Sequence, residues 1–192
     1  MRGTCDGISS LGGRERGFTL IEILIVMGLV GVLVALTAPN LTVIIPQIKV
    51  DKAASKLAAD LRLAQQKAVE EMALVRFRIE PSQNRYYAMV RERGAAGLWY
   101  QDGYNDYVED PLKGGAYLLV DFDVSTNRFH GVEITSISPA SALGETWGFY
   151  ISELGELRWP FSDITVTLTD PRSGYSRQVQ ITHPLGKVTV LP

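Results

Sequence analysis

The chain has 192 residues, and its 19 lysines and arginines nearly balance its 21 aspartates and glutamates, for a formal net charge of −2. This balance excludes the strongly basic composition of a general nucleic-acid-binding protein. The single cysteine, Cys5, excludes a disulfide within the chain and a cysteine-based metal site.

The N-terminal region changes character abruptly after residue 17. Residues 1–17 include five charged residues, whereas residues 18–38 contain only three polar residues, Thr19, Glu22 and Thr37. A helix of this length spans roughly 32 Å, close to the ~30 Å hydrocarbon core of a bilayer. We therefore predict one membrane-spanning helix over residues 18–38.

The charges around this helix predict its orientation. Three arginines precede it, and no lysine or arginine follows before Lys49. The positive-inside rule therefore predicts a cytoplasmic N-terminus and export of the rest of the chain. A cleaved secretory signal peptide is one alternative, although its apolar core would be shorter. A plain single-pass anchor is the other, and it leaves Glu22 and the boundary between Gly17 and Phe18 unexplained.

The segment Gly17-Phe18-Thr19-Leu20-Ile21-Glu22, followed by the apolar run, resembles the processing motif of type IV prepilins and type II secretion pseudopilins. This resemblance implies that residues 1–17 are a leader peptide. It also implies that a prepilin peptidase cuts between Gly17 and Phe18 and methylates the new N-terminus of Phe18. The mature chain would then contain no cysteine, because Cys5 lies in the leader.

Glu22 needs a partner, because an acid at the centre of a membrane helix costs about 2.5–3.5 kcal/mol. It lies about one helical turn from the Phe18 amine that cleavage would create. Its carboxylate can neutralise that amine in its own chain or in a neighbouring subunit, and it complements the positive end of the helix dipole. The resemblance implies the neighbour, so that Glu22 sets the register of a subunit entering a fibre. A carboxylate that reaches back to the membrane interface is the alternative.

Residues 39–73 are predicted to form an amphipathic continuation of the helix. Small and apolar residues recur at alternating spacings of four and three: Val50, Ala54, Leu57, Leu61, Ala64 and Ala68. Polar residues are expected to face solvent: Lys52, Lys56, Asp60, Gln66, Lys67 and Glu70. Breaks are expected at Pro39 and Pro46, because proline has no backbone N–H to donate.

The hydrophobic period changes to two from Leu74, and residues 74–192 are predicted to form an antiparallel β domain. The first strand alternates through Val75, Phe77 and Ile79, and a turn at residues 81–84 precedes the next. Further strands are predicted at residues 86–90, 117–122, 129–137, 147–151, 164–168, 179–182 and 188–191. The expected fold is α+β, with a long N-terminal helix packed on an antiparallel sheet or sandwich, as in pilins.

Residues 57–69, 149–156 and 179–188 resemble, in that order, segments of the H-type minor pseudopilins and of FimT-like minor pilins. This resemblance implies a non-enzymatic subunit near the tip of a periplasmic pseudopilus that helps to prime fibre assembly and protein export. It implies a single-pass inner-membrane protein with its C-terminal domain in the periplasm. The implied partners are the prepilin peptidase, other major and minor pseudopilins or pilins, and the inner-membrane assembly platform. A FimT-like pilin that acts in pilus biogenesis or DNA uptake is the alternative.

No pattern of catalytic residues is found in the sequence. His130 and His183 stand alone, without a neighbouring acid or nucleophile pattern. Gly114-Gly115 lacks the lysine and hydroxyl residue of a phosphate-binding loop, and no Gly-x-Ser-x-Gly segment occurs. We therefore expect neither an enzyme nor a cofactor.

Two further groups of residues are candidate binding sites. Asp102, Asp106 and Asp110 belong to an oxygen-rich segment. We interpret it as a solvated turn, because its spacing is not that of an EF-hand. A calcium site is the alternative, since such oxygen-rich loops can hold calcium. DNA receptors among the FimT-like pilins carry Gly-Arg-x-Arg near the C-terminus, whereas this chain has Gly186-Lys187-Val188-Thr189. Lys187 and Arg177 remain candidate DNA contacts, but the low charge of this region argues against nucleic acid as a partner.

Overall fold

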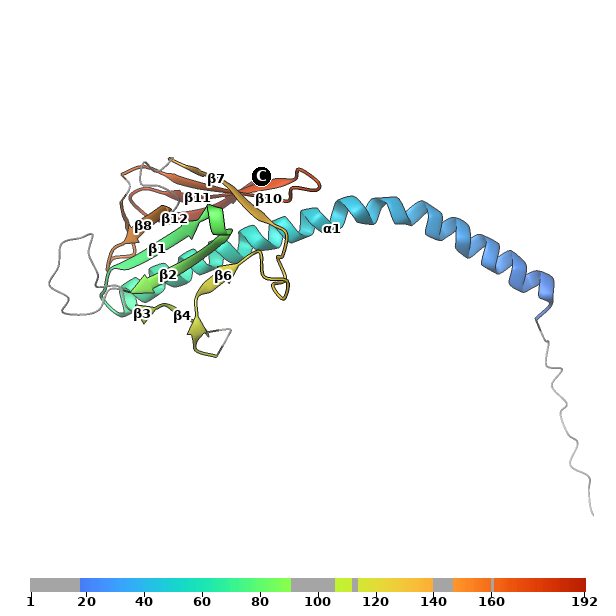
Figure 1. The fold of residues 1–192 in the computed structure, drawn as a ribbon, viewed down its shortest axis with the longest axis horizontal. Coiled ribbons are helices and arrows are strands. Elements are labelled where there is room, and N and C mark those ends of the chain that lie inside the picture. The colour runs from blue at the N-terminus through green and yellow to red at the C-terminus, as the bar shows by residue number, and fades with distance from the viewer. Residues whose placement is uncertain (1–17, 91–105, 112–113, 140–146, 160) are drawn as a thin grey trace, which may run out of the picture. The chain divides into compact units, whose positions relative to one another are not determined.

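The computed structural model describes residues 18–90, 106–111, 114–139, 147–159 and 161–192, and within these it describes residues 36–43, 106, 147 and 159 by their backbone alone. Residue contacts group into two compact units, Met1–Leu41 and Thr42–Pro192. The helix α1 (Leu20–Glu70) begins in the first unit and ends in the second (Figure 1).

α1 runs through Pro39 and Pro46, so the expected breaks are absent. A proline inside a helix removes one hydrogen bond, but it does not end the helix when the flanking residues keep helical angles. α1 ends at Glu70, three residues before the predicted end. Met72 adopts a left-handed φ of 47°, and its N–H donates to Val69 O (3.3 Å). Ala73 N–H donates to Ala68 O (3.1 Å), which completes a Schellman motif with methionine in the position that glycine usually takes.

The described residues of the second unit form three antiparallel sheets, drawn in Figure 1. The six-stranded sheet has the order β3-β2-β1-β8-β9, with β6 also paired to β2. Its strands are β1 (Val75–Glu80), β2 (Arg85–Val90), β3 (Asp106–Tyr107), β6 (Leu119–Asp121), β8 (Trp147–Ile151) and β9 (Leu157–Trp159). The four-stranded sheet has the order β12-β11-β10-β7, with β7 (Glu133–Ser138), β10 (Ile164–Thr169), β11 (Ser176–Thr182) and β12 (Lys187–Leu191). A two-stranded sheet pairs β4 (Glu109–Asp110) with β5 (Ala116–Tyr117), and a 3-10 turn, η1 (Pro81–Gln83), connects β1 to β2.

The predicted fold class is confirmed, and the strands at residues 147–151, 164–168, 179–182 and 188–191 coincide with β8 or lie within β10, β11 and β12. The prediction for residues 117–122 is wrong, because this segment is divided between β5 and β6. The buried Leu118 separates the two strands. Its N–H donates a hydrogen bond to Val108 O and its carbonyl accepts one from Ala88 N–H, so the segment does not pair with a single neighbouring strand.

The prediction for residues 129–137 is also wrong at its start, because β7 begins only at Glu133. Asn127 holds the preceding residues in a turn: its side-chain oxygen accepts a hydrogen bond from Phe129 N–H (3.0 Å), and its carbonyl accepts one from His130 N–H (3.1 Å). The sequence pattern did not predict the short strands β3, β4 and β9.

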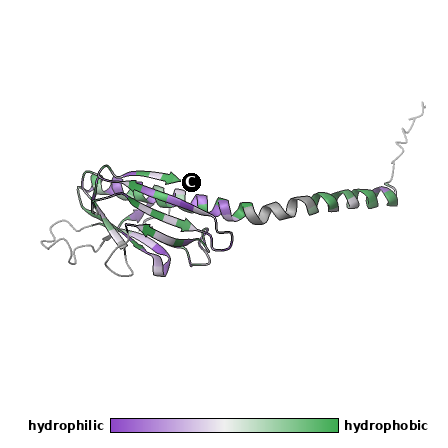
Figure 2. Ribbon diagram, turned by 90° about the horizontal axis from the view of Figure 1, so that it is seen from above, coloured by the Kyte–Doolittle hydropathy of each residue, from purple (hydrophilic) through white to green (hydrophobic). Residues whose placement is uncertain are grey.

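One hydrophobic core joins α1 to the sheets of the second unit. The predicted stripe of α1 is confirmed, because all six of its residues are buried: Val50, Ala54, Leu57, Leu61, Ala64 and Ala68. Opposite this stripe, the buried Phe77 ring stacks with the rings of Tyr86 (5.6 Å) and Phe149 (5.3 Å). Apolar and polar residues alternate along the strands, as Figure 2 shows by colour. The alternate strand residues that point inward thus pack against the buried stripe of α1 and complete the core.

Candidate functional site

The described chain begins at Phe18, one residue after the predicted cleavage site, so Gly17 lies outside the described residues. Phe18 and Thr19 precede α1, and Thr19 caps its N-terminus. The Thr19 Oγ1 and carbonyl oxygens both accept hydrogen bonds from Glu22 N–H (3.3 and 3.0 Å). The spacing Thr19-x-x-Glu22 is that of a capping box, a signal that would have located this helix start in the sequence. The cap places Glu22 in the first turn of α1.

At the start of α1, through residue 35, the side chains face outward on every side of the helix. Glu22 is exposed, Phe18 is 78% exposed, and all residues from 18 to 35 are exposed. A helix that is apolar on all sides is normally covered by lipid or by other helices. These side chains are therefore free to contact lipid or the helices of other subunits.

Among the residues that the structure describes, no helix is both long enough and apolar enough to qualify as a membrane span.

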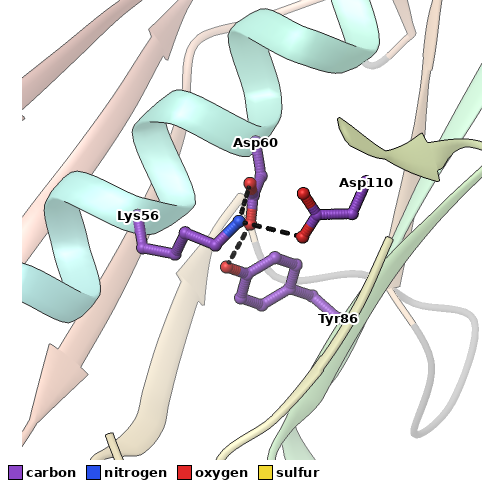
Figure 3. A network of polar contacts seen from close by, with 4 residues as sticks. All are labelled: Lys56, Asp60, Tyr86 and Asp110. Atoms are coloured by element: carbon purple, nitrogen blue, oxygen red, sulfur yellow. Dashed lines mark hydrogen bonds and ion pairs between the residues drawn. The ribbon is translucent and has the colours of Figure 1, made fainter. Parts of the chain in front are cut away.

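A buried polar network connects α1 to the β domain, and Figure 3 shows its four side chains pointing toward one another. Asp60 accepts hydrogen bonds from Lys56 Nζ (2.5 Å) and from the Tyr86 hydroxyl (2.8 Å). Lys56 Nζ also lies 3.5 Å from Asp110 Oδ2. Asp60 is only 2% exposed, so the expectation that it faces solvent is wrong. It lies three residues after Leu57 and four before Ala64, which places it on the buried stripe.

Burial shifts the ionisation of this network. Loss of hydration raises the pKa of Asp60 above its ordinary value, although the hydrogen bonds from Lys56 and Tyr86 oppose the shift. Burial, with the nearby Asp60 carboxylate, raises the pKa of Tyr86 well above 10.0. Tyr86 therefore remains a neutral hydrogen-bond donor at neutral pH. This arrangement ties α1 to β2 and β4 rather than supplying a reactive group.

Asp60→Asn is expected to change how stability depends on pH. Because folding raises the pKa of Asp60, the native state holds this proton more tightly than the unfolded chain does. The Asp60 contribution to stability is full below the unfolded-state pKa near 3.8, and it is lost as the pH rises through the raised folded-state pKa. The wild-type protein should therefore gain stability relative to Asp60→Asn as the pH falls from about 7 toward about 4.

At neutral pH, Asp60→Asn should cost about 1–3 kcal/mol, because asparagine keeps an oxygen for the Tyr86 hydroxyl but presents no charge to Lys56. Urea unfolding at several pH values measures both effects. A difference between the two proteins that stays constant with pH, or that moves the other way, would contradict the raised pKa.

The structure does not bring together, within the residues it describes, the three aspartates of the alternative calcium site. Asp102 lies outside them, and Asp106 is described by its backbone alone. Asp110 is buried and lies beside Lys56, so it does not belong to a solvated turn. No cluster of three or more histidine, cysteine, aspartate or glutamate side chains able to hold a metal occurs in the described parts of the chain.

The two candidate DNA contacts lie apart. Lys187 begins β12 opposite Thr182, whereas Arg177 lies five residues back along β11, which corresponds to about 17 Å. Arg177 forms an ion pair with Asp51 (2.6 Å) and lies over the Tyr175 ring (5.4 Å). Its charge therefore helps to hold α1 to β11. Lys187 is exposed.

Lys187 lines a surface groove of about 580 Å³ between the last turns of α1 and two hairpin turns of the β domain, residues 152–156 and 183–186. The Gln65 amide joins the turns, because its Nε2 donates to Gly155 O (3.2 Å) and to Gly186 O (2.6 Å). Leu157 N–H also donates to Pro184 O (2.9 Å). In the sequence, these two turns can be recognised because each ends in a glycine followed by a polar residue, Gly155-Glu156 and Gly186-Lys187.

Gly186→Ala is expected to destabilise the domain far more than Gly174→Ala, its matched control. Both glycines have positive φ, 65° and 69°, so alanine at either position costs about 1–2 kcal/mol in strain. A Cβ at Gly174 would meet nothing within 4 Å, whereas a Cβ at Gly186 would overlap the Gln65 amide and lie 2.8 Å from Gly155 O. We therefore expect about 3–5 kcal/mol for Gly186→Ala. Urea unfolding measures both losses, and equal losses would contradict this packing.

Comparison with known proteins gives three findings. Residues 12–38 match the family model described as the prokaryotic N-terminal methylation motif. The type II secretion system protein H of Klebsiella pneumoniae is 30% identical over 105 residues, which cover 53% of this chain and 59% of that protein. The chain therefore spans about three fifths of the length of this curated relative.

Two structures of the minor pseudopilin EpsH from the type 2 secretion system of Vibrio cholerae share the fold. Their TM-scores are 0.52 and 0.51, each at 11% identity. The matches cover 74% and 76% of this chain and 96% and 94% of EpsH. The chain thus carries a prokaryotic N-terminal methylation motif, is similar in sequence to a type II secretion system protein H, and shares its fold with the minor pseudopilin EpsH.

Proposed function

We propose that the chain is a minor pseudopilin, a structural subunit near the tip of the periplasmic pseudopilus of a type II secretion system. In this role it helps to prime fibre assembly and thereby protein export. The observation that carries the proposal is the methylation motif over residues 12–38, which leads into a helix whose first residues, through residue 35, are exposed on every side. The similarity to protein H of a secretion system favours secretion over a pilus.

Maturation follows from the motif. The prepilin peptidase removes residues 1–17 by cutting between Gly17 and Phe18, and it methylates Phe18. Residues 18–38 cross the inner membrane as a single span with the leader in the cytoplasm. Residues 39–73 extend the helix, and residues 74–192 form the periplasmic β domain. The arginines before Phe18 and the exposed apolar side chains after it support this topology.

Assembly depends on Glu22, which pairs with the Phe18 amine of a neighbouring subunit. Thr19 caps the helix and fixes Glu22 in its first turn, where the carboxylate is exposed rather than used within the chain. An amine and a carboxylate attract each other strongly where water is excluded. The pair therefore draws subunits together at one register, and the other pseudopilins and the assembly platform are the partners. The role is structural and requires no catalytic group.

DNA uptake by a FimT-like pilin, the alternative, has weaker support. The Arg177 guanidinium is held by Asp51, so Lys187 is the exposed cation of the predicted pair. One cation contributes little to phosphate binding, which depends on many contacts. Salt-sensitive DNA binding that is lost in Lys187→Ala would favour this alternative.

Co-expression of the full chain with a prepilin peptidase and the other pseudopilins tests the proposal. We expect the processed chain in the sheared fibre fraction, and restored export in cells that lack protein H. A processed chain that stays in the membrane fraction, with export unrestored, would overturn the assignment to the pseudopilus.

A further inference from the structure

The outer face of the six-stranded sheet, which points away from the core, carries arginine and tyrosine side chains in contact with one another. Phe77 and Tyr86 are fully buried in the core. Side chains alternate between the two faces of a strand, so the next residues along, Arg78 and Tyr87, point outward. These two residues are direct cross-strand partners. The guanidinium groups of Arg78 and Arg85 both lie over the Tyr87 ring, at 5.8 and 6.0 Å.

Two further tyrosines extend this group of side chains across the neighbouring strands. The Tyr107 ring on β3 lies 5.8 Å from the Tyr87 ring, and the Tyr117 ring on β5 lies 4.9 Å from the Tyr107 ring. Tyr117 is 61% exposed. We call these five residues the arginine–tyrosine band: Arg78, Arg85, Tyr87, Tyr107 and Tyr117. Tyrosine and arginine are enriched among the residues that contribute most to protein–protein binding, so this composition is typical of an interaction surface.

The band carries a positive charge that the described residues do not neutralise. Arg85 is paired with the Glu80 carboxylate (2.6 Å), which also accepts a hydrogen bond from the Tyr87 hydroxyl (3.0 Å). Among the described residues, no carboxylate pairs with Arg78, and its buried Nε has no hydrogen-bond partner. The planar fork of an arginine binds a carboxylate through two parallel hydrogen bonds. The surface is therefore complementary to an acid.

Gly148 on β8 provides the space in which Arg78 lies, because the two residues are direct cross-strand partners. A Cβ at Gly148 would lie 3.5 Å from Arg78 Cγ and 3.7 Å from Arg76 Nε. Both arginine stems therefore lie close to the backbone of β8, and the Arg76 guanidinium lies over the Tyr150 ring (5.7 Å). Arg78 is thus held between Gly148 and Tyr87. A side chain that is already positioned loses little conformational entropy when a partner binds.

We propose that the arginine–tyrosine band binds an acidic segment of a different protein, in which a carboxylate lies beside an apolar or aromatic side chain. The carboxylate pairs with Arg78, and the apolar side chain packs on Tyr107 and Tyr117. A nucleic acid fits less well, because phosphate binding depends on many cations and Arg85 is already neutralised. The contact goes beyond the proposed function, since it requires neither the apolar start of α1 nor the Phe18 amine.

Fluorescence anisotropy tests this contact with the full-length, processed protein in a non-ionic detergent. The probe is a labelled peptide of glutamates that flank a phenylalanine, and the same peptide with glutamines is the control probe. We expect Arg78→Gln to weaken binding of the glutamate peptide at least about fivefold. Arg172→Gln is the matched control, because it removes the same charge from an exposed turn between β10 and β11, and it should bind as the wild type does. Added salt should weaken the binding, since it screens exposed charges.

Tyr117→Ser provides the second arm, because it removes an exposed ring with little effect on the fold. It should weaken binding of the glutamate peptide at least about threefold. Equal binding by Arg78→Gln and Arg172→Gln, or equal binding of the two peptides by the wild type, would overturn the proposal. Tighter binding of oligothymidylate than of the glutamate peptide would replace the acidic protein by a nucleic acid.

Sedimentation of the same variants without peptide tests a second copy of the chain as the occupant. We expect the wild type and Arg78→Gln to sediment alike. A wild-type dimer that Arg78→Gln abolishes would overturn a different protein as the partner. None of these results depends on methylation of Phe18 or on entry into fibres, so the proposed function is tested separately.

Discussion

Glu22→Ala is expected to be cleaved by the prepilin peptidase yet to enter fibres at least about tenfold less than the wild-type chain, a loss of about 1.4 kcal/mol or more per contact. Removing one member of a buried charge pair leaves the other charge unpaired where water is scarce, which is strongly unfavourable. Here the unpaired group is the Phe18 amine of the neighbouring subunit. The ratio of fibre-bound to membrane-bound processed chain measures the effect.

Glu22→Asp is the matched control, because it keeps the charge one methylene shorter. It should recover most of the incorporation, whereas Glu22→Ala should not. Normal incorporation of Glu22→Ala would remove the proposed role of the acid. Loss of cleavage in the same variant would move that role from assembly to processing.

Phe77→Ala is expected to destabilise the β domain by about 3–5 kcal/mol. Phe77 is fully buried on β1, and its ring stacks between Tyr86 and Phe149, so alanine leaves a cavity at the centre of the core. A loss of this size is a large fraction of the stability of a typical domain. Urea unfolding of the detergent-solubilised protein, followed by tyrosine and tryptophan fluorescence, measures it.

Phe161→Ala is the control for the loss of an aromatic ring. Phe161 is 80% exposed and meets the His183 ring edge-on at 6.0 Å, so its removal should cost less than about 1 kcal/mol. Similar losses for the two variants would mean that the ring stack of Phe77 does not form the centre of the core.

The parts of the fold that were predictable from sequence depend on local periodicity. The buried stripe of α1 and the alternating burial of β10 are both properties of neighbouring residues. The end of α1 was not predictable, because Met72 takes a left-handed angle that usually marks a glycine. The division of residues 117–122 was also hidden, since it depends on hydrogen bonds from Leu118 to Val108 and Ala88 in other segments.

The same contrast holds for the sites. The segment that begins at Gly17 could be recognised because its residues are contiguous. The network around Asp60 could not, because its partner Tyr86 lies 26 residues away, and a polar residue in a helix is expected to face solvent. The ion pair that occupies Arg177 was equally hidden, since Asp51 lies 126 residues away in the sequence. Contacts that form only through tertiary packing have no regular sequence spacing from which they could be predicted.

Mass spectrometry of the membrane-extracted protein is the most direct test of the maturation on which the proposed function depends. A chain that begins with N-methylated Phe18 is the expected result, with residues 1–17 absent. A functional chain that still begins at Met1 would contradict it, because no amine would then lie one helical turn from Glu22.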